Sequence, residues 1–133
     1  MKKVLFLCTG NSCRSQLAEA IVNYRLSDQW SAFSAGSHPE GYVHPLAIAA
    51  LREIGIEHKG EAKHFDVFKG THFDLVITVC DNAAKACPTW LGSAGNRVHM
   101  PFSDPFSSND LATYRKVRDE IEAQVVGYLS QLA

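Results

Sequence analysis

Hydrophobic and polar positions divide the chain into short apolar runs and longer amphipathic stretches, separated by loops rich in glycine, proline and serine. Continuous or alternating apolar runs predict strands, and apolar residues that recur every three or four positions predict helices. The predicted strands are residues 3–7, 30–35, 73–79 and 97–100. The predicted helices are residues 15–27, 44–54 and 110–132, with short helices in 62–69 and 81–86 and a flexible linker at 91–96. The pattern therefore alternates strands with helices along the whole chain.

This alternation is typical of an α/β protein, with a four-stranded parallel sheet and helices on both faces. Ligands of such sheets bind at the carboxyl ends of the strands, where the order of the strands reverses. Cys8, Cys80 and Asp104 each fall at or just after the end of a predicted strand. The sequence has no internal repeat and no low-complexity tract, so we expect residues 1–133 to form a single domain.

The composition excludes several classes of protein. Of the 133 residues, 46% are hydrophobic and 20% are charged, which favours a packed core over disorder. A net charge of −1 argues against a nucleic-acid-binding protein. No apolar run approaches the ~20 residues that a membrane span requires, and the N-terminal pattern is not that of a signal peptide. We expect a cytoplasmic monomer that binds neither nucleic acid nor membrane.

The most informative segment joins the first predicted strand to the first predicted helix. It reads Cys8-Thr9-Gly10-Asn11-Ser12-Cys13-Arg14-Ser15. Such a loop of small residues can direct its backbone N–H groups at an oxyanion, with help from the positive end of the helix. Arg14 adds a planar guanidinium, and Ser15 is a candidate helix cap and hydrogen-bond donor to Cys8. The same field favours a thiolate at Cys8, so the loop is predicted to hold both a nucleophile and an anion pocket. The alternative is a buried cysteine in a helix-capping loop, which the Cys-x5-Arg spacing disfavours.

Two further cysteines, Cys80 and Cys87, follow the third predicted strand. If the segment between them is helical, their Cα atoms lie about 10 Å apart, beyond the roughly 7 Å that a disulfide tolerates. A disulfide between them would require unwinding, so we expect faster amide exchange across residues 81–87 in the oxidised form. Two buried core cysteines are the alternative. The cysteines lack the paired spacing of a zinc site and the histidines show no ligand spacing, so no metal is expected.

The loop of residues 8–15, the segment from Cys80 to Cys87, and Asp104 with Pro105 together resemble the low-molecular-weight tyrosine phosphatase superfamily. Within it, the similarity is greatest to the thioredoxin-coupled arsenate reductases and extends over nearly the whole chain. The resemblance implies a sheet of order 2-1-3-4, which would place Cys80 at the same sheet edge as Cys8.

The resemblance also implies roles for these residues. Cys8 would be the nucleophile, residues 9–15 would bind the oxyanion, and Asp104 would be the general acid rather than part of an ordinary Asp-Pro turn. Cys80 and Cys87 would complete a three-cysteine disulfide relay that thioredoxin regenerates, without a bound cofactor. Cys13 is expected to pack within the loop and to be dispensable for activity.

The chain departs from the tyrosine phosphatases after Asp104. The phosphatases have two aromatic residues after the Asp-Pro pair, whereas here Phe106 is followed by Ser107 and Ser108. This favours a small inorganic oxyanion such as arsenate or phosphate over phosphotyrosine. The leading hypothesis is an arsenate reductase with weak phosphatase activity. The second is a phosphatase of phosphotyrosine or other phosphomonoesters, and the third is a non-catalytic oxyanion-binding or redox-sensing module.

Lys63 is a second position at which the sequence differs from some relatives. Some relatives hold a potassium ion beside the anion loop through an Asn, a Glu, a Ser and an Asp. Asn11, Glu19 and Ser34 match three of these positions, and Lys63 falls where the Asp would lie. Because the lysine ammonium can replace the ion, we expect no dependence on potassium.

Overall fold

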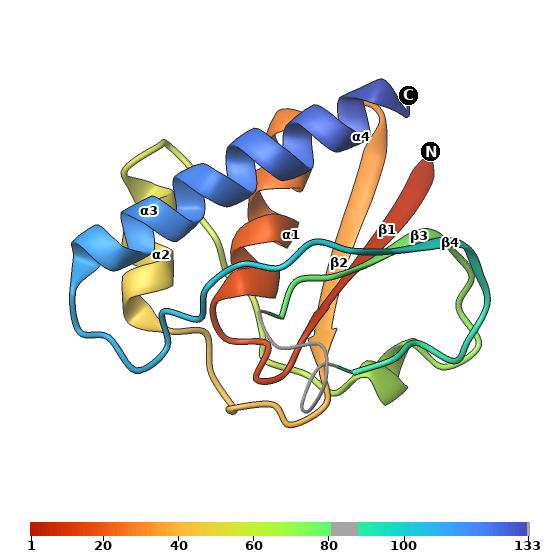
Figure 1. Cartoon of the computed structure of the whole chain (residues 1–133), viewed down its shortest axis with the longest axis horizontal. Helices are drawn as coiled ribbons and strands as arrows, with labels where there is room; N and C mark the ends of the chain where they lie inside the picture. Colours follow the sequence, from red (N-terminus) through yellow and green to blue (C-terminus); the bar gives the residue numbers. More distant parts are fainter. Residues whose placement is uncertain (81–87, 133) are drawn as a thin grey trace.

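A four-stranded parallel sheet forms the centre of the molecule. The structure is a computed structural model that describes residues 1–80 and 88–132. The sheet has the order β2-β1-β3-β4, which confirms the predicted topology (Figure 1). Its strands are β1 (Lys2–Cys8), β2 (Trp30–Gly36), β3 (Phe73–Thr78) and β4 (Ala94–His99). In the registers of β1, Cys8 lies opposite Gly36 and Leu7 lies opposite Thr78, so the strands end at one common edge.

The longer helices pack against one face of this sheet. They are α1 (Arg14–Arg25), α2 (Pro45–Arg52) and α3 (Leu111–Ile121), which continues through a π-helical turn η2 (Glu122–Val126) into α4 (Gly127–Gln131). Figure 1 shows α3 and α4 crossing over α1. Val4 and Phe6 of β1 point into this layer and share one apolar core with the buried residues of all three helices. Alternate residues of a strand point to opposite faces, so Leu5 and Leu7 lie on the other side.

The opposite face carries a smaller core of aromatic rings. The 3-10 helix η1 (Phe65–Phe68) covers part of it, and Trp90 covers another part. The ring centroids of Phe33 and Phe73 are 5.7 Å apart, and those of Phe73 and Trp90 are 5.6 Å apart, both in edge-to-face arrangements. Such pairs add to the stability that area burial supplies. The sheet is therefore covered on both sides, as the apolar strand sequences require.

Some element boundaries differ from those predicted. Residues 94–96 belong to β4 rather than to a linker, because their backbone pairs with β3 although their side chains are mostly exposed. Gly95 suits this position, since a Cβ there would lie 2.7 Å from the carbonyl oxygen of Asp74. Of residues 62–69 only η1 is helical. The helix predicted at 81–86 and the position of Cys87 lie outside the described residues.

Loops at the carboxyl ends of the strands are fastened to one another through their backbones. His38 N donates to Thr9 O at 2.9 Å, Glu40 N donates to Gly10 O at 3.0 Å, and His44 N donates to Ser12 O at 3.0 Å. Gly36 is required for this approach, because a Cβ on it would lie 2.4 Å from the Thr9 carbonyl oxygen. The segment that follows β2 therefore runs alongside the loop between β1 and α1.

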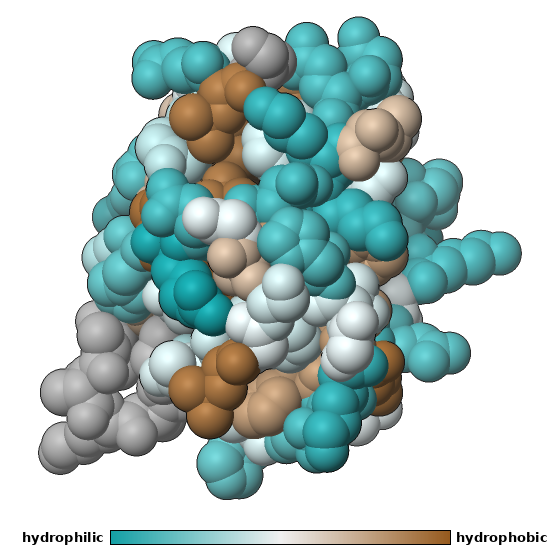
Figure 2. All heavy atoms as spheres, turned by 90° about the vertical axis from the view of Figure 1, so that its right-hand side faces the viewer, coloured by the Kyte–Doolittle hydropathy of each residue, from teal (hydrophilic) through white to brown (hydrophobic). Residues whose placement is uncertain are grey.

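One face of the molecule shows how polar and apolar side chains are distributed on the surface. Figure 2 shows one face on which hydrophilic side chains predominate and hydrophobic ones gather in separate groups near the top and the bottom. Isolated groups of this kind are normal for a folded chain. Among the described helices, none has the length and apolar character needed to cross a membrane.

Candidate active site

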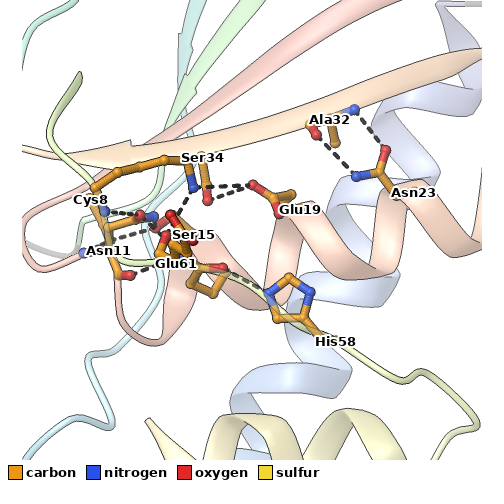
Figure 3. A network of polar contacts seen from close by, with 11 residues as sticks. Cys8, Asn11, Ser15, Glu19, Asn23, Ala32, Ser34, His58 and Glu61 are labelled. Carbon is orange, nitrogen blue, oxygen red and sulfur yellow. Dashed lines mark hydrogen bonds and ion pairs between the residues drawn. The ribbon is translucent and has the colours of Figure 1, made fainter. Parts of the chain in front are cut away.

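The loop between β1 and α1 wraps around the sulfur of Cys8. Cys8 is the last residue of β1 and is 2% exposed, and Arg14 is the first residue of α1. The Ser15 hydroxyl lies 2.8 Å from Cys8 Sγ, and the backbone N–H of Asn11 donates to the same sulfur at 3.3 Å (Figure 3). Polar groups around a sulfur at the amino end of a helix form the surroundings that are typical of nucleophilic cysteines. The loop therefore suits Cys8 to nucleophilic attack.

Ser15 serves this sulfur instead of capping the helix. The N-cap position of α1 is Cys13, and no side chain caps it there. The expectation that Ser15 is a helix cap is wrong, because its hydroxyl bonds the Cys8 sulfur and accepts a hydrogen bond from Asn11 Nδ2 at 2.8 Å. The uncapped N–H groups at this helix end remain directed toward the loop, where an anion can bind them.

Asn11 gives the loop its shape. Its φ of 50° lies in the left-handed region, which asparagine tolerates better than most residues. Its side-chain oxygen accepts hydrogen bonds from Gln16 Nε2 and from the backbone N–H of Lys63, both at 3.0 Å. The strained backbone is thus held by contacts to α1 and to the segment before η1.

Arg14 links the loop to the segment after β4. Its side chain is only 5% exposed; one terminal nitrogen donates to the carbonyl oxygen of Phe102 at 3.1 Å, and the other lies 3.3 Å from Asp104 Oδ2. The other oxygen of Asp104 accepts a hydrogen bond from the N–H of Phe106 at 3.0 Å, so the carboxylate is held by its own turn. The Asp104 side chain is 45% exposed, which leaves it accessible from solvent.

A cavity of about 290 Å³ opens above this loop. Its walls contain residues of the loop, of the end of β3, of the turn after β4 and of the segment after β2; they are Cys8, Thr9, Gly10, Ser12, Cys13, Arg14, Glu40, Cys80, Asp104 and Phe106. The structure therefore brings Cys8, Arg14, Cys80 and Asp104 around one space. Cys8 and Cys13 are free thiols, and Cys80 is disulfide-bonded. Cys87, which was predicted to act with them, lies outside the described residues.

Cys13 differs chemically from Cys8. It is buried, and this burial is the main reason why its pKa is raised to about 12, despite a hydrogen bond with the Tyr114 hydroxyl 3.9 Å away. Burial also raises the pKa of Tyr114, and the nearby Cys13 adds to that shift. Cys13 is therefore a protonated thiol at neutral pH. The same loop thus holds one cysteine with close polar neighbours and another whose burial dominates its chemistry.

A polar network lies behind the loop, on the side away from the cavity. Glu19 accepts a hydrogen bond from Ser34 at 2.8 Å (Figure 3). The Lys63 ammonium lies 3.9 Å from the same carboxylate oxygen. The ammonium also donates to the Glu61 carbonyl oxygen at 3.0 Å. The lysine that the sequence places in the position of an ion ligand therefore has its cation beside Glu19. Among the described residues, no group of three or more His, Cys, Asp or Glu side chains could hold a metal ion.

His58 contacts this network through the side chain of Gln16. Its Nε2 lies 2.8 Å from Gln16 Oε1, and Gln16 Nε2 donates to Asn11. Burial lowers the pKa of His58, and the Coulombic effect of Glu19 opposes this shift while that of Lys63 adds to it. Sequence reasoning assigned no role to His58 or Gln16, because their contacts with each other and with Glu61 are long-range.

A second aromatic residue, which the sequence did not reveal, packs beside Phe106 of the cavity wall. The ring of Tyr42, from the segment between β2 and α2, has its centroid 6.3 Å from that of Phe106. Tyr42 is 49% exposed, and the His44 ring packs edge-on against Phe106 at 5.6 Å. The aromatic rings beside the cavity therefore come from two loops that are far apart in the sequence. Glu40 was not predicted at this site either.

Comparisons with known proteins identify the family of this chain. The sequence profile of "Low molecular weight phosphotyrosine protein phosphatase" matches residues 3–133. An arsenate reductase of Brevibacillus brevis is 41% identical over 127 residues, which span 93% of this chain and 91% of that protein.

Solved structures are similar as well. "An arsenate reductase in the phosphate binding state" superposes with a TM-score of 0.86 at 29% identity and full coverage of both chains. A Corynebacterium glutamicum thioredoxin-dependent arsenate reductase superposes with a TM-score of 0.72 at 25% identity, over 98% of this chain and 60% of that one. Curated relatives at about 40% identity are named as arsenate reductases, and the chain belongs to the low molecular weight phosphotyrosine protein phosphatase family.

Proposed function

We propose that the protein is an arsenate reductase, which converts arsenate to arsenite with electrons from its own cysteines. The observation that carries this proposal is that Cys8 and Cys80 line one cavity together with Arg14 and Asp104. A phosphatase needs the first cysteine, the arginine and the acid, but it has no use for a second cysteine at the cavity wall. The curated relatives at about 40% identity support the same activity.

The first step is attack by the Cys8 thiolate on the arsenic atom. The backbone N–H groups of the loop and the guanidinium of Arg14 hold the arsenate oxygens. An arsenic–sulfur bond forms and an arsenic–oxygen bond breaks, and the departing oxygen takes a proton and leaves as water. In this proposal Asp104 gives that proton, because its side chain lines the cavity and is 45% exposed.

The second step transfers two electrons to arsenic. The Cys80 thiolate attacks Cys8 Sγ, so that a sulfur–sulfur bond forms while the arsenic–sulfur bond breaks and leaves its electron pair on arsenic. Arsenic(V) becomes arsenic(III), which departs as arsenite, and the two cysteines share a disulfide. Cys87 then attacks Cys80, which frees the Cys8 thiolate and leaves a Cys80–Cys87 disulfide.

An external dithiol must reduce this last disulfide, and we propose thioredoxin. The Corynebacterium glutamicum protein of similar structure is described as thioredoxin-dependent, which supports this choice. Reduction of the disulfide returns two electrons, so the cycle needs no bound cofactor. We propose that the protein acts as a monomer in the cytoplasm, where thiols are kept reduced.

Hydrolysis of phosphomonoesters is the second candidate function. It requires Cys8, Arg14 and Asp104 but neither Cys80 nor Cys87. The ring of Phe106 at the cavity wall, with the Tyr42 ring packed 6.3 Å from it, favours this activity because aromatic rings can contact the organic part of an aryl phosphate. We propose that this activity is weak and secondary, and that it follows from the shared tetrahedral shape of phosphate and arsenate.

The decisive experiment couples arsenate reduction to NADPH oxidation through thioredoxin and thioredoxin reductase. The native protein is expected to oxidise NADPH only when arsenate is present, and Cys80→Ser and Cys87→Ser are each expected to stop turnover. Thiol counting after arsenate treatment provides a second measurement, because a reductase loses two thiols per chain and a phosphatase loses none. Arsenate-independent thiol counts together with hydrolysis of p-nitrophenyl phosphate by both serine variants would assign the phosphatase function instead.

A further inference from the structure

Glu40 places a carboxylate at the wall of an anion-binding cavity. It belongs to the exposed loop after β2 and lines the cavity together with Cys8 and Arg14. Its backbone N–H donates to the Gly10 carbonyl oxygen at 3.0 Å, which fastens the residue to the anion loop. Neither the proposed reduction nor the proposed hydrolysis uses this side chain.

The Glu40 side chain lies directly over Gly10. A Cβ built on Gly10 would come within 2.8 Å of Glu40 Cγ and 3.2 Å of Glu40 Oε2. The carboxylate is therefore held against the rim of the loop, and the glycine makes room for it. Arg14, by contrast, is almost fully buried at 5% side-chain exposure. The positive charge thus lies deep in the cavity, and a negative charge lies at its mouth.

The aromatic residues beside the cavity favour the same selection. Phe106 lines the cavity wall and the Tyr42 ring lies 6.3 Å from it, and the negative partial charge of an aromatic face favours cations over anions beside it. An inorganic oxyanion that fits inside the loop meets mainly Arg14 and the backbone N–H groups. A larger substrate places the rest of its structure beside Glu40 and the two rings.

We propose that Glu40 is a specificity-determining residue that selects substrates by the charge of the part outside the loop. Compact oxyanions enter, and esters whose organic part is neutral or cationic are accepted. Esters with a second negative charge beside the phosphate are disfavoured. The proposal deepens the function proposed above, because it concerns the same site.

Matched substrates test the proposal directly. Two phosphotyrosine peptides of equal length would be compared, one with lysine and one with glutamate on each side of the phosphotyrosine. Native protein is expected to hydrolyse the lysine peptide with the higher kcat/KM. In Glu40→Gln the lysine-to-glutamate ratio is expected to fall by roughly three- to tenfold, and the change is expected to shrink as salt screens the charge.

Asp28→Asn is the matched control, since it also removes one exposed carboxylate but lies before β2, at the edge of the sheet away from the cavity. This variant is expected to keep the native ratio. Arsenate reduction would be measured in the same variants. A lysine-to-glutamate ratio in Glu40→Gln equal to that of the native protein would overturn the proposal, even if arsenate reduction is intact.

A second measurement is independent of turnover. The rate at which Cys8 reacts with an anionic methanethiosulfonate (the ethylsulfonate) would be compared with the rate for the cationic ethyltrimethylammonium reagent, using mass spectrometry of the peptide that contains Cys8. Glu40→Gln is expected to raise the anionic-to-cationic rate ratio, and Asp28→Asn is expected to leave it unchanged. Equal ratios in the native protein and Glu40→Gln would overturn the proposal. If the ratio shifts while arsenate causes no NADPH oxidation, the proposed reductase function fails and the role of Glu40 stands.

Discussion

The two sides of the anion loop differ in what their polar groups face. On the cavity side, Cys8, Arg14 and Asp104 face an open space of about 290 Å³. On the other side, Asn11 and Glu19 are held by contacts with neighbouring side chains and backbone groups. The cavity side is thus arranged to bind and react, and the network side is arranged to hold the loop in one shape. The difference predicts that changes on the first side remove activity without unfolding the protein, whereas changes on the second side affect stability and loop geometry together.

Cys8→Ser is expected to have the largest effect. A serine hydroxyl does not ionise in this field as a thiol does, so both arsenate reduction and phosphate ester hydrolysis should fall at least roughly a thousandfold. The variant should still bind phosphate and should unfold at nearly the native denaturant concentration, because the side chains have similar shape. Steady-state rates and urea unfolding measure the two properties. Half of the native activity in this variant would rule out Cys8 as the nucleophile.

Arg14→Lys comes next in expected size. A lysine ammonium cannot present the two terminal nitrogens that now reach Phe102 and Asp104, nor can it hold two oxygens of an anion. We expect kcat/KM to fall by roughly a hundredfold, with a clear loss of phosphate affinity. Titration with inorganic phosphate, followed by protection of Cys8 from alkylation, measures that affinity. Unchanged protection would mean that the anion is bound without this guanidinium.

Lys63→Ala examines the network side. The Lys63 side chain is 24% exposed and that of Glu19 is 16% exposed, so both are largely buried. Removal of the ammonium therefore leaves the Glu19 carboxylate without its nearby cation. We expect a loss of about 1–3 kcal/mol of stability and a severalfold loss of activity. The native protein should work equally well in potassium and in sodium at fixed ionic strength, and the variant should be stimulated by potassium. A clear stimulation of the native protein would contradict the view that Lys63 replaces an ion.

How far the sequence predicts this site depends on the kind of contact. Cys8 and Arg14 lie in one short loop, and their spacing between a strand and a helix is enough to identify them. Asp104 and Cys80 are found because parallel strands end at a common edge. Glu40 and Tyr42 come from a loop whose path is set by backbone hydrogen bonds to Thr9 and Gly10, which no periodicity encodes. The roles of Cys8, Arg14, Cys80, Cys87 and Asp104 remain predictions for the experiments above.

For the fold as well, elements with a regular apolar pattern are predicted from the sequence, and features that depend on backbone pairing or on particular contacts are not. The three apolar strands and the long helices are predicted because burial imposes a regular pattern on them. The beginning of β4 is missed because Ala94, Gly95 and Asn96 are mostly exposed and join the sheet through backbone pairing alone. The sequence suggests Ser15 as the cap of α1, but its hydroxyl is instead hydrogen-bonded to Cys8 and Asn11. The preference of serine for helix caps fails to predict the structure here, in the loop that contains the proposed nucleophile.

Cys13→Ser sharpens the contrast within the loop itself. Burial raises the pKa of Cys13 to about 12, so this thiol stays protonated and does not compete as a nucleophile. The serine variant should keep activity within about threefold of native and lose only about 1 kcal/mol of stability, because a hydroxyl is buried in place of a sulfur. Iodoacetamide at pH 8 should label Cys8 much faster than Cys13 in the native protein. A Cys13→Ser protein without reductase activity would contradict this assignment.

The smallest expected effect concerns His58. Burial holds its pKa in the folded protein below the value of about 6.5 that an unfolded chain has. Between these two values the unfolded chain binds more protons than the folded one, so stability must rise with pH across that window. Conversely, acidification below about pH 6.5 should remove stability until the folded pKa is passed, and the loss should then level off.

His58→Gln should abolish this part of the pH dependence, because glutamine does not titrate. One proton limits the slope to about 1.4 kcal/mol per pH unit, and the partial exposure of His58 makes the observed slope smaller. Urea unfolding between pH 5 and 7.5 would compare the native protein with His58→Gln and with His38→Gln, which changes an exposed histidine of the loop after β2. Carboxylates titrate in all three proteins, so the difference between their slopes is the quantity that reports on His58. Equal slopes in the native protein and His58→Gln would mean that the network behind the loop does not hold this imidazole in its neutral form, and the contrast between the two sides of the loop would then rest on Lys63 alone.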